Sequence, residues 1–138
     1  MSKTRSPTRR RLLRMTIYPS LRYHDARAAI DWLAEAFGFE ATAIHADDDG
    51  VIHHAELSGF GGIVMLGTEP EGGDPTWGEH AGQGWLYLSH DDVDALHDRA
   101  VAAGAEIIRP LQDTDYGSRD FTARDPEGNV WSFGTYSP

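Results

Sequence analysis

The sequence predicts an α+β fold made of two β-α-β-β-β units whose sheets form a concave trough. Two segments with apolar residues at helical spacing each follow one β-prone run and precede three more. A stretch rich in proline and glycine separates these repeats, and 138 residues fit one domain or two half-domains with a common core. We expect four parts: a basic, disordered leader at 1–15, a first unit at 16–67, a linker loop at 68–83 and a second unit at 84–136.

The first unit begins with a short β-prone run in which Pro19 is typical of an edge strand or a strand start. Asp25 can cap the helix Ala26–Phe37, and Gly38 is expected to end it. The turn at residues 47–50 ends in Asp-Gly, which is a hairpin signal. The expected strands are Ile17–Arg22, Phe39–His45, Val51–Leu57 and Ile63–Leu66.

The second unit repeats this order. Asp91 or Asp92 can cap a helix whose apolar face runs from Val93 to Val101, and Gly104 is expected to end it. Residues 125–129 have the composition of a turn between the last two strands. The expected strands are Gly84–Leu88, Glu106–Leu111, Arg119–Ala123 and Val130–Thr135, the second of them interrupted by Pro110.

Alternation of side chains along these strands predicts which residues share a face. One helix per unit covers one face of its small sheet, so the other face needs a ligand, side chains or a partner chain to fill it. The residues predicted on the trough face are Tyr18, Ser20, Met65, Trp85, Tyr87, Val130 and Ser132. Those predicted under the helices are Ile17, Leu21, Val64, Leu66, Leu86, Leu88, Trp131 and Phe133.

The charge of the chain is unevenly distributed. Residues 1–14 hold six cations and no acid, whereas the rest holds six arginines against all 22 acidic residues, a net charge of −16. Such an acidic body repels phosphates, so we expect no nucleic acid partner. No apolar run approaches the roughly 18 residues of a membrane span. Because the chain also lacks cysteine and the apolar stretch of a secretory signal, we expect a cytoplasmic protein with no membrane partner.

Several segments carry a family resemblance. They are Ala29-Ile30-Asp31-Trp32-Leu33 with Ala36-Phe37-Gly38-Phe39, His54-Ala55-Glu56-Leu57 with Ile63-Val64-Met65-Leu66, Asp91-Asp92-Val93-Asp94-Ala95-Leu96 with Ala102-Ala103-Gly104-Ala105, and Tyr116-Gly117 with Asp125-Pro126-Glu127-Gly128-Asn129-Val130-Trp131. Over residues 16–136 the chain resembles the vicinal oxygen chelate superfamily (glyoxalase I, extradiol dioxygenases and bleomycin-resistance proteins), and most of all its PhnB-like branch. The resemblance implies the fold, but this superfamily hosts many reactions and also pure binders.

The resemblance also implies where a metal would bind. In the metal-dependent members, four strand positions supply His or Glu ligands to a divalent ion that polarises substrate oxygens. Those positions fall on Tyr18, Met65, Trp85 and Ser132 in this chain. None of them is His, Glu or Asp, so we expect no metal, no cofactor and no catalytic residue from that set.

Other polar clusters and one loop have alternative interpretations. His54 and Glu56 lie two residues apart on one strand face and can form a metal site outside the family pattern, although a strand histidine is more often exposed or hydrogen-bonded. His90 and His97 are expected at the surface. A tryptophan in a loop rich in glycine and proline, Trp77, can cover the trough, contact a partner chain or simply pack on the body.

The sequence therefore favours a metal-free small-molecule binding protein of the glyoxalase/bleomycin-resistance type. Aromatic faces with a few hydroxyls suit an aromatic or cationic organic compound, which the protein would sequester, with a possible role in antibiotic resistance. The expected ligand-binding residues are Tyr18, Ser20, Met65, Trp77, Trp85, Tyr87, Tyr116 and Ser132. The resemblance further implies a homodimer.

Two other functions stay open at this point. One is a metal-dependent lyase, isomerase or dioxygenase of the same superfamily, which the missing ligand set disfavours. The other is a regulatory or structural protein whose trough is filled by its own side chains, with Trp85 and Met65 as core residues.

Overall fold

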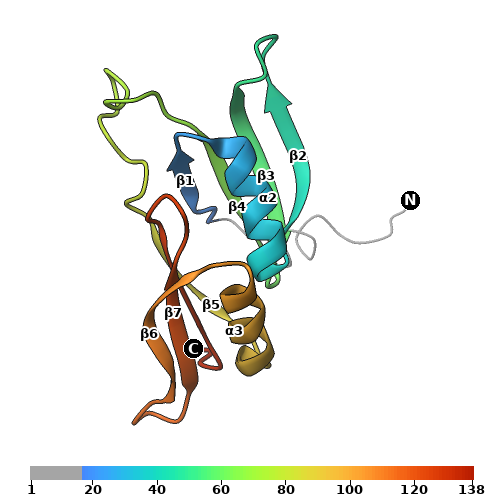
Figure 1. The fold of residues 1–138 in the computed structure, drawn as a ribbon, viewed down its shortest axis with the longest axis vertical. Helices are drawn as coiled ribbons and strands as arrows, with labels where there is room; N and C mark the ends of the chain where they lie inside the picture. Colours follow the sequence, from blue (N-terminus) through green and yellow to red (C-terminus); the bar gives the residue numbers. More distant parts are fainter. Residues whose placement is uncertain (1–16) are drawn as a thin grey trace, which may run out of the picture.

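The computed structural model describes residues 17–138, and the predicted leader at 1–15 lies outside the described residues. The chain forms two four-stranded sheets, each with one helix, in the repeated order β-α-β-β-β (Figure 1). The predicted α+β fold class is confirmed. No helix of residues 17–138 is long and apolar enough to cross a membrane.

The first sheet has the strand order β1-β4-β3-β2. Its elements are β1 (Ser20–Tyr23), α2 (Ala26–Phe37), β2 (Glu40–Ala46), β3 (Ile52–Gly59) and β4 (Gly62–Thr68). β1 pairs with β4 in parallel, whereas the other neighbours are antiparallel. The last strand of the unit therefore lies beside the first one, and β1 forms an edge of the sheet.

The second sheet repeats this topology with the order β5-β8-β7-β6. Its elements are β5 (Trp85–Ser89), α3 (Val93–Ala102), β6 (Glu106–Asp113), β7 (Arg119–Arg124) and β8 (Val130–Gly134). β5 pairs with β8 in parallel, as β1 does with β4. Pro110 lies inside β6, which pairs only with β7, and an edge strand tolerates the missing backbone donor.

The ends of both helices follow from local sequence. Asp25 accepts a hydrogen bond from the Ala28 amide at 3.0 Å, and Gly38 ends the helix α2 in the left-handed conformation with φ of 83°. Of the two predicted caps for the helix α3, Asp92 is the one that acts, because it accepts from the Ala95 amide at 3.1 Å. These capped ends explain why the bounds of Ala26–Phe37 are the predicted ones.

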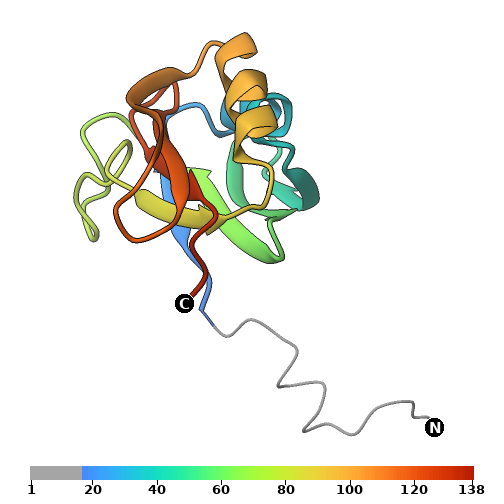
Figure 2. The ribbon, with the colours of Figure 1, turned by 90° about the horizontal axis from the view of Figure 1, so that it is seen from below.

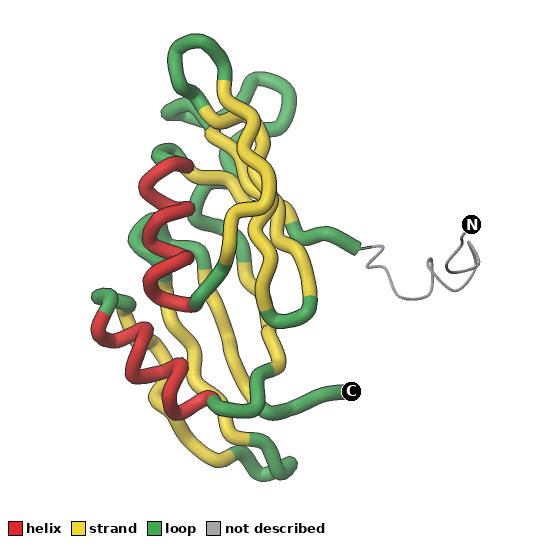
Figure 3. Tube along the Cα trace, turned by 90° about the vertical axis from the view of Figure 1, so that its right-hand side faces the viewer, coloured by secondary structure: helices red, strands yellow, loops and turns green. Residues whose placement is uncertain are grey.

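Both helices cover the same side of the two sheets, and no helix within residues 17–138 covers the opposite side (Figure 3). The C-terminal segment leaves the body on that uncovered side (Figure 2). We call this surface the open face. It is the surface that the sequence predicts as the trough.

The core lies between the sheets and the helices and belongs to both units. Phe37, at the end of α2, has its ring centroid 5.5 Å from that of Trp131 and 4.7 Å from that of Phe133, both on β8. Trp131 and Phe133 are fully buried, as alternation predicts. The placement of Ile17 under the helices is wrong: its side chain is 79% exposed, because the residue precedes Pro19 and β1 and lies outside the sheet.

A buried carboxylate links the two units. Asp125, in the turn before β8, accepts hydrogen bonds from the Tyr23 hydroxyl at 2.6 Å and from the Trp131 indole at 3.0 Å. Its other oxygen accepts from the amides of Glu127 and Asn129. Burial, together with the charge of Asp125 and the hydrogen bond to it, raises the pKa of Tyr23, so the phenol stays a neutral donor.

We predict that Asp125→Asn lowers the free energy of unfolding by about 2–4 kcal/mol, because an amide nitrogen then faces buried donors that have lost their acceptor. Tyr23→Phe is expected to cost about 1–2 kcal/mol, since Trp131 still donates to the carboxylate. Urea unfolding measures both effects. Asp98→Asn is the control, because that side chain is 85% exposed. An Asp125→Asn variant as stable as this control would contradict the proposed link.

Candidate functional site

The open face brings together most of the residues that the sequence predicts as a site. Across β1 and β4, Ser20 lies opposite Met65. Across β5 and β8, Trp85 lies opposite Val130, and Tyr87 lies opposite Ser132. Each sheet thus contributes part of the predicted set, from strands that occupy equivalent places in the two units.

The internal repeat supports the assignment of the four family metal positions. Tyr18 and Met65 are 47 residues apart, as are Trp85 and Ser132. Because Ser20–Met65 and Tyr87–Ser132 are equivalent register pairs, Tyr18 and Trp85 occupy equivalent positions two residues earlier. A phenol, a thioether, an indole and an aliphatic hydroxyl do not fit a divalent metal of the kind that His and Glu hold.

Trp85 is the first residue of β5. Its side chain is 75% exposed, but its indole N–H donates to the Ser132 hydroxyl at 3.1 Å. Ser132 is buried, and its hydroxyl is also 2.9 Å from that of Thr122 on β7. The indole is therefore anchored at its polar edge, and most of its surface remains available for contact with another molecule.

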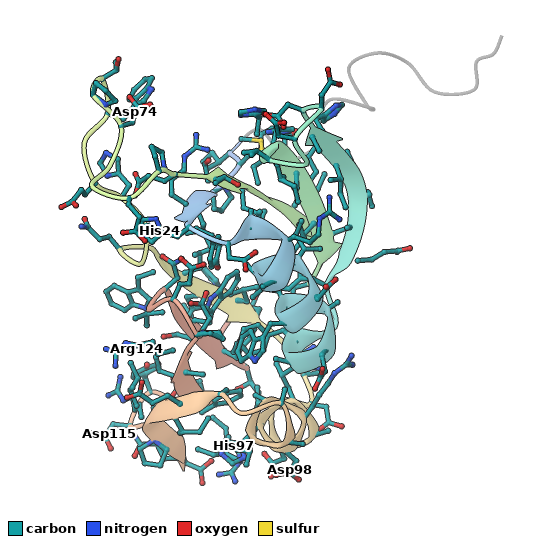
Figure 4. All side chains as sticks on the ribbon, turned by 45° about the horizontal axis from the view of Figure 1, so that its top comes forward. His24, Asp74, His97, Asp98, Asp115 and Arg124 are labelled. Atoms are coloured by element: carbon teal, nitrogen blue, oxygen red, sulfur yellow. The ribbon has the colours of Figure 1, made fainter. Side chains whose placement is uncertain are left out.

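The loop between β4 and β5 forms one wall of a hollow beside β1. This hollow has a volume of about 350 Å³ and joins two predicted residues, Ser20 and Trp77. Its remaining lining consists of Leu21, Arg22, His80, Gln83 and Gly84. Trp77 is 72% exposed and does not pack into the core, and Asp74 stands at the tip of the same loop (Figure 4).

Glu69 fixes the base of this loop. The Glu69 side chain is buried and accepts hydrogen bonds from the amides of His80 and Ala81, the latter at 2.7 Å. Burial acts to raise the pKa of Glu69, but the two amide donors and the nearby His80 and His24 outweigh it, and the pKa is lowered. The conformation of the loop, and with it the hollow, thus depends on the ionised carboxylate of Glu69.

The remaining predicted residues lie farther along the second sheet. Tyr87 is 43% exposed and lines a hollow of about 190 Å³ with Pro19 and Ile63, between β4 and β5. Tyr116, in the turn between β6 and β7, is 67% exposed and has its ring 6.0 Å from that of Tyr136. The hollow beside β1 thus contains Ser20 and Trp77 of the predicted set, and the hollow between β4 and β5 contains Tyr87.

The set of site residues predicted from the sequence contains no residue of β7. Arg119 and Phe121 face the helix α3, where Arg119 contacts Asp94 at 2.8 Å and Phe121 packs against His97. Alternation therefore places Asp120, Thr122 and Arg124 on the open face. The same period-two pattern that identified Trp85 and Tyr87 was sufficient to find them.

The histidines form no metal site in residues 17–138, where no group of three or more His, Asp or Glu side chains has suitable geometry. His54 contacts Glu56 at 2.9 Å, and its ring lies 5.8 Å from that of His45. His90 and His97, which are expected at the surface, are half-buried there. His90 packs against Phe60 and His97 against Phe121, so both rings extend the aromatic core.

Comparisons with known proteins show the family and support the fold. A sequence model of the Glyoxalase/Bleomycin resistance protein/Dioxygenase superfamily matches residues 14–133. The chain is 35% identical over 129 residues to an uncharacterized protein of Mycobacterium bovis, covering 84% of this chain and 80% of that one. TioX from Micromonospora sp. ML1 is 36% identical with a TM-score of 0.76, covering 89% of this chain and 99% of that chain. TnmS3, an antibiotic binding protein from Streptomyces sp. CB03234, is 26% identical with a TM-score of 0.65, covering 86% and 96%.

We predict that Glu69→Gln increases hydrogen exchange at the amides of His80 and Ala81 by about tenfold, because a neutral amide accepts more weakly than a carboxylate. Protection factors of these two amides measure the effect. Glu71→Gln is the matched control, since Glu71 is exposed in the same loop. Unchanged protection in Glu69→Gln would show that other contacts hold the loop.

The same contact predicts a pH dependence. The pKa of Glu69 is lowered from its ordinary value of 4.5, so its contribution is complete above that value. The contribution of Glu69 to loop stability is lost as the pH falls through the lowered pKa that Glu69 has in the folded protein. We therefore expect the His80 and Ala81 amides to lose protection at acidic pH before global unfolding, as measured by hydrogen exchange against circular dichroism.

Proposed function

Because the chain belongs to the Glyoxalase/Bleomycin resistance protein/Dioxygenase superfamily, we propose that it binds and sequesters a small aromatic or cationic organic compound on its open face. In this proposal no metal takes part in binding. The ligand-contacting residues are those predicted from the sequence: Tyr18, Ser20, Met65, Trp77, Trp85, Tyr87, Tyr116 and Ser132.

The observation that carries this proposal is the anchored, exposed indole of Trp85. An aromatic ring that is already held in place loses little conformational freedom when a planar molecule stacks on it. The hydrogen bond to Ser132 supplies that restraint, and the indole still exposes 75% of its surface. Stacking on such a ring contributes about 0.5–1.5 kcal/mol beyond the burial of apolar area.

Charge supports a cationic ligand. Residues 15–138 hold six arginines and all 22 acidic residues, so the field around the open face attracts cations at long range.

One structural relative, TnmS3, is an antibiotic binding protein. We extend this to an antibiotic-resistance role for the present chain, in which the bound compound is kept from its target. The cytoplasm is the compartment we propose, because intracellular targets are reached there.

We further propose that the protein acts as a homodimer. The open face carries exposed aromatic side chains that a second copy can partly cover, as the family resemblance implies. Filling of the trough by the chain's own side chains is the competing interpretation, and the exposure of Trp85 and Tyr87 within one chain does not favour it.

We predict that Trp85→Ala weakens binding of a planar aromatic probe by at least tenfold, because the stacking surface is removed. The probes are acridone, which is neutral, and 9-aminoacridine, which is cationic. Fluorescence anisotropy of the probe, which is itself fluorescent, gives the affinity for every variant. Trp85→Phe is expected to retain most of the binding, and Ile44→Ala, an exposed apolar residue on β2, serves as the control. Equal affinity of Trp85→Ala and Ile44→Ala would exclude this site.

The alternative function, a metal-dependent lyase, isomerase or dioxygenase, predicts a different result. We expect the untagged protein to hold far less than one metal ion per chain after incubation with nickel, zinc, iron or manganese, as measured by mass spectrometry. The donor set at Tyr18, Met65, Trp85 and Ser132 is the reason. One tightly bound ion per chain would instead favour the enzyme.

A further inference from the structure

Three tyrosines are linked by ring contacts, and one of them, Tyr87, lies beside the acidic residue Asp120. Tyr136, near the C-terminus, has its ring 6.4 Å from that of Tyr87 at 76° and 6.0 Å from that of Tyr116 at 89°. The Tyr136 amide donates to the Tyr87 hydroxyl at 3.1 Å, which fixes the two residues relative to each other. We call Tyr87, Tyr116, Tyr136 and Asp120 the tyrosine cluster.

Gly134 brings the acid and the phenols together. A Cβ atom at this position would overlap the Tyr87 hydroxyl and would lie 2.7 Å from the Cβ of Asp120. Asp120 is the cross-strand partner of Gly134. The absence of a side chain on β8 therefore creates the space into which Tyr87 and Asp120 both extend.

Asp120 has a buried oxygen atom without a hydrogen-bond partner. Its side chain is only 7% exposed, and its Oδ1 is the one buried side-chain nitrogen or oxygen atom of the described residues that lacks a hydrogen-bond partner. None of the ion pairs in residues 17–138 includes Asp120, because the adjacent Arg119 points to the opposite face and binds Asp94 and Asp113. A buried carboxylate without a counter-ion is costly, and such groups cluster at functional sites.

The ring of Tyr87 beside this carboxylate, and those of Tyr136 and Tyr116 that continue from it, are suited to a cation. Tyr116 is 67%, Tyr136 47% and Tyr87 43% exposed, so their surfaces are accessible. Faces of aromatic rings attract cations through their quadrupoles, and aromatic cages recognise alkylated ammonium groups without any hydrogen bond. The Asp120 oxygen is covered, so its charge acts on such a group through short-range electrostatics rather than by direct contact.

We propose that the tyrosine cluster is a binding subsite for the alkylammonium group of the ligand, either a protonated amine or a quaternary ammonium. This inference rests on the proposed function and adds the position at which positive charge is recognised. The cluster shares β5 with Trp85, since Trp85 and Tyr87 are two residues apart on one face. The ammonium subsite therefore lies next to the stacking surface.

The experiment titrates ¹⁵N-labelled protein with tetramethylammonium chloride and follows the amide resonances of Tyr87, Asp120 and Gly134. We expect saturable shifts with a millimolar dissociation constant. The neutral molecule tert-butanol, of similar size, is expected to bind at least tenfold more weakly, and sodium chloride controls for ionic strength. Shifts that match those of sodium chloride would overturn the proposal.

Variants separate recognition from folding. Asp120→Asn is expected to weaken tetramethylammonium binding at least tenfold, whereas Asp113→Asn, whose side chain is 81% exposed on the same hairpin, is expected to change it less than twofold. Asp120→Asn is expected to keep or raise the midpoint of urea unfolding, because an unpaired buried charge is removed. Unchanged binding, or a lowered midpoint that assigns Asp120 a structural role, would overturn the proposal.

The aromatic contribution has its own test. Tyr136→Leu is expected to weaken tetramethylammonium binding about fivefold, and Tyr136→Phe to restore it, because the ring face and not the hydroxyl makes the contact. Equal loss in both variants would exclude a cation–π contact. Acridone anisotropy distinguishes the two proposals: acridone binding without tetramethylammonium binding removes only this inference, whereas loss of both removes the proposed function.

Discussion

The buried carboxylate of Asp125 sets the position of the two units, and the rest of the structure depends on it. It joins Tyr23 of the first unit to Trp131 of the second, while Glu127 of the same turn accepts the amides of His24 and Asp25 at 2.7 and 2.8 Å. The neighbouring Asn129 holds the Gly84 amide at 2.6 Å, just before β5 begins. A side chain at Gly84 would collide with Leu21, so β5 starts in close contact with β1. One turn thus fixes both the shared core and the place of Trp85 beside β1.

This arrangement separates the residues that stabilise the fold from the surface proposed for binding. The helix side holds the aromatic core around Phe37, Trp131 and Phe133, and burial of that surface supplies the main driving force for folding. The open face needs no such packing, so its side chains can be exposed or electrostatically unsatisfied without loss of the fold. Trp85 and Asp120 show these two conditions, one as a largely exposed aromatic ring and the other as an unpaired buried acid.

Sequence alone predicts what local patterns determine. The helix Ala26–Phe37 follows from its cap and its terminal glycine. Alternation correctly places Trp131 and Ser132 on opposite faces of the sheet. Ile17 is misplaced because alternation cannot show that a strand begins only after Pro19. The role of Asp125 is hidden for a related reason: an Asp-Pro-Glu-Gly-Asn turn has the same composition whether its first carboxylate faces water or a neighbouring unit. Asp120 was within reach of alternation, but its missing partner is a tertiary property.

The strand β5 also limits the shape of any ligand that uses both parts of the open face. Residues two apart on a strand project from the same face about 6.6–6.8 Å apart. In the proposed binding mode, Trp85 supplies the stacking surface and Tyr87 belongs to the tyrosine cluster, so a planar ring and an ammonium group have to lie at a comparable separation. A short link between ring and nitrogen meets this condition, whereas a charge delocalised within the ring itself reaches only the Trp85 side. The geometry of one strand therefore favours an aromatic amine with its charge on a side chain over a planar cation.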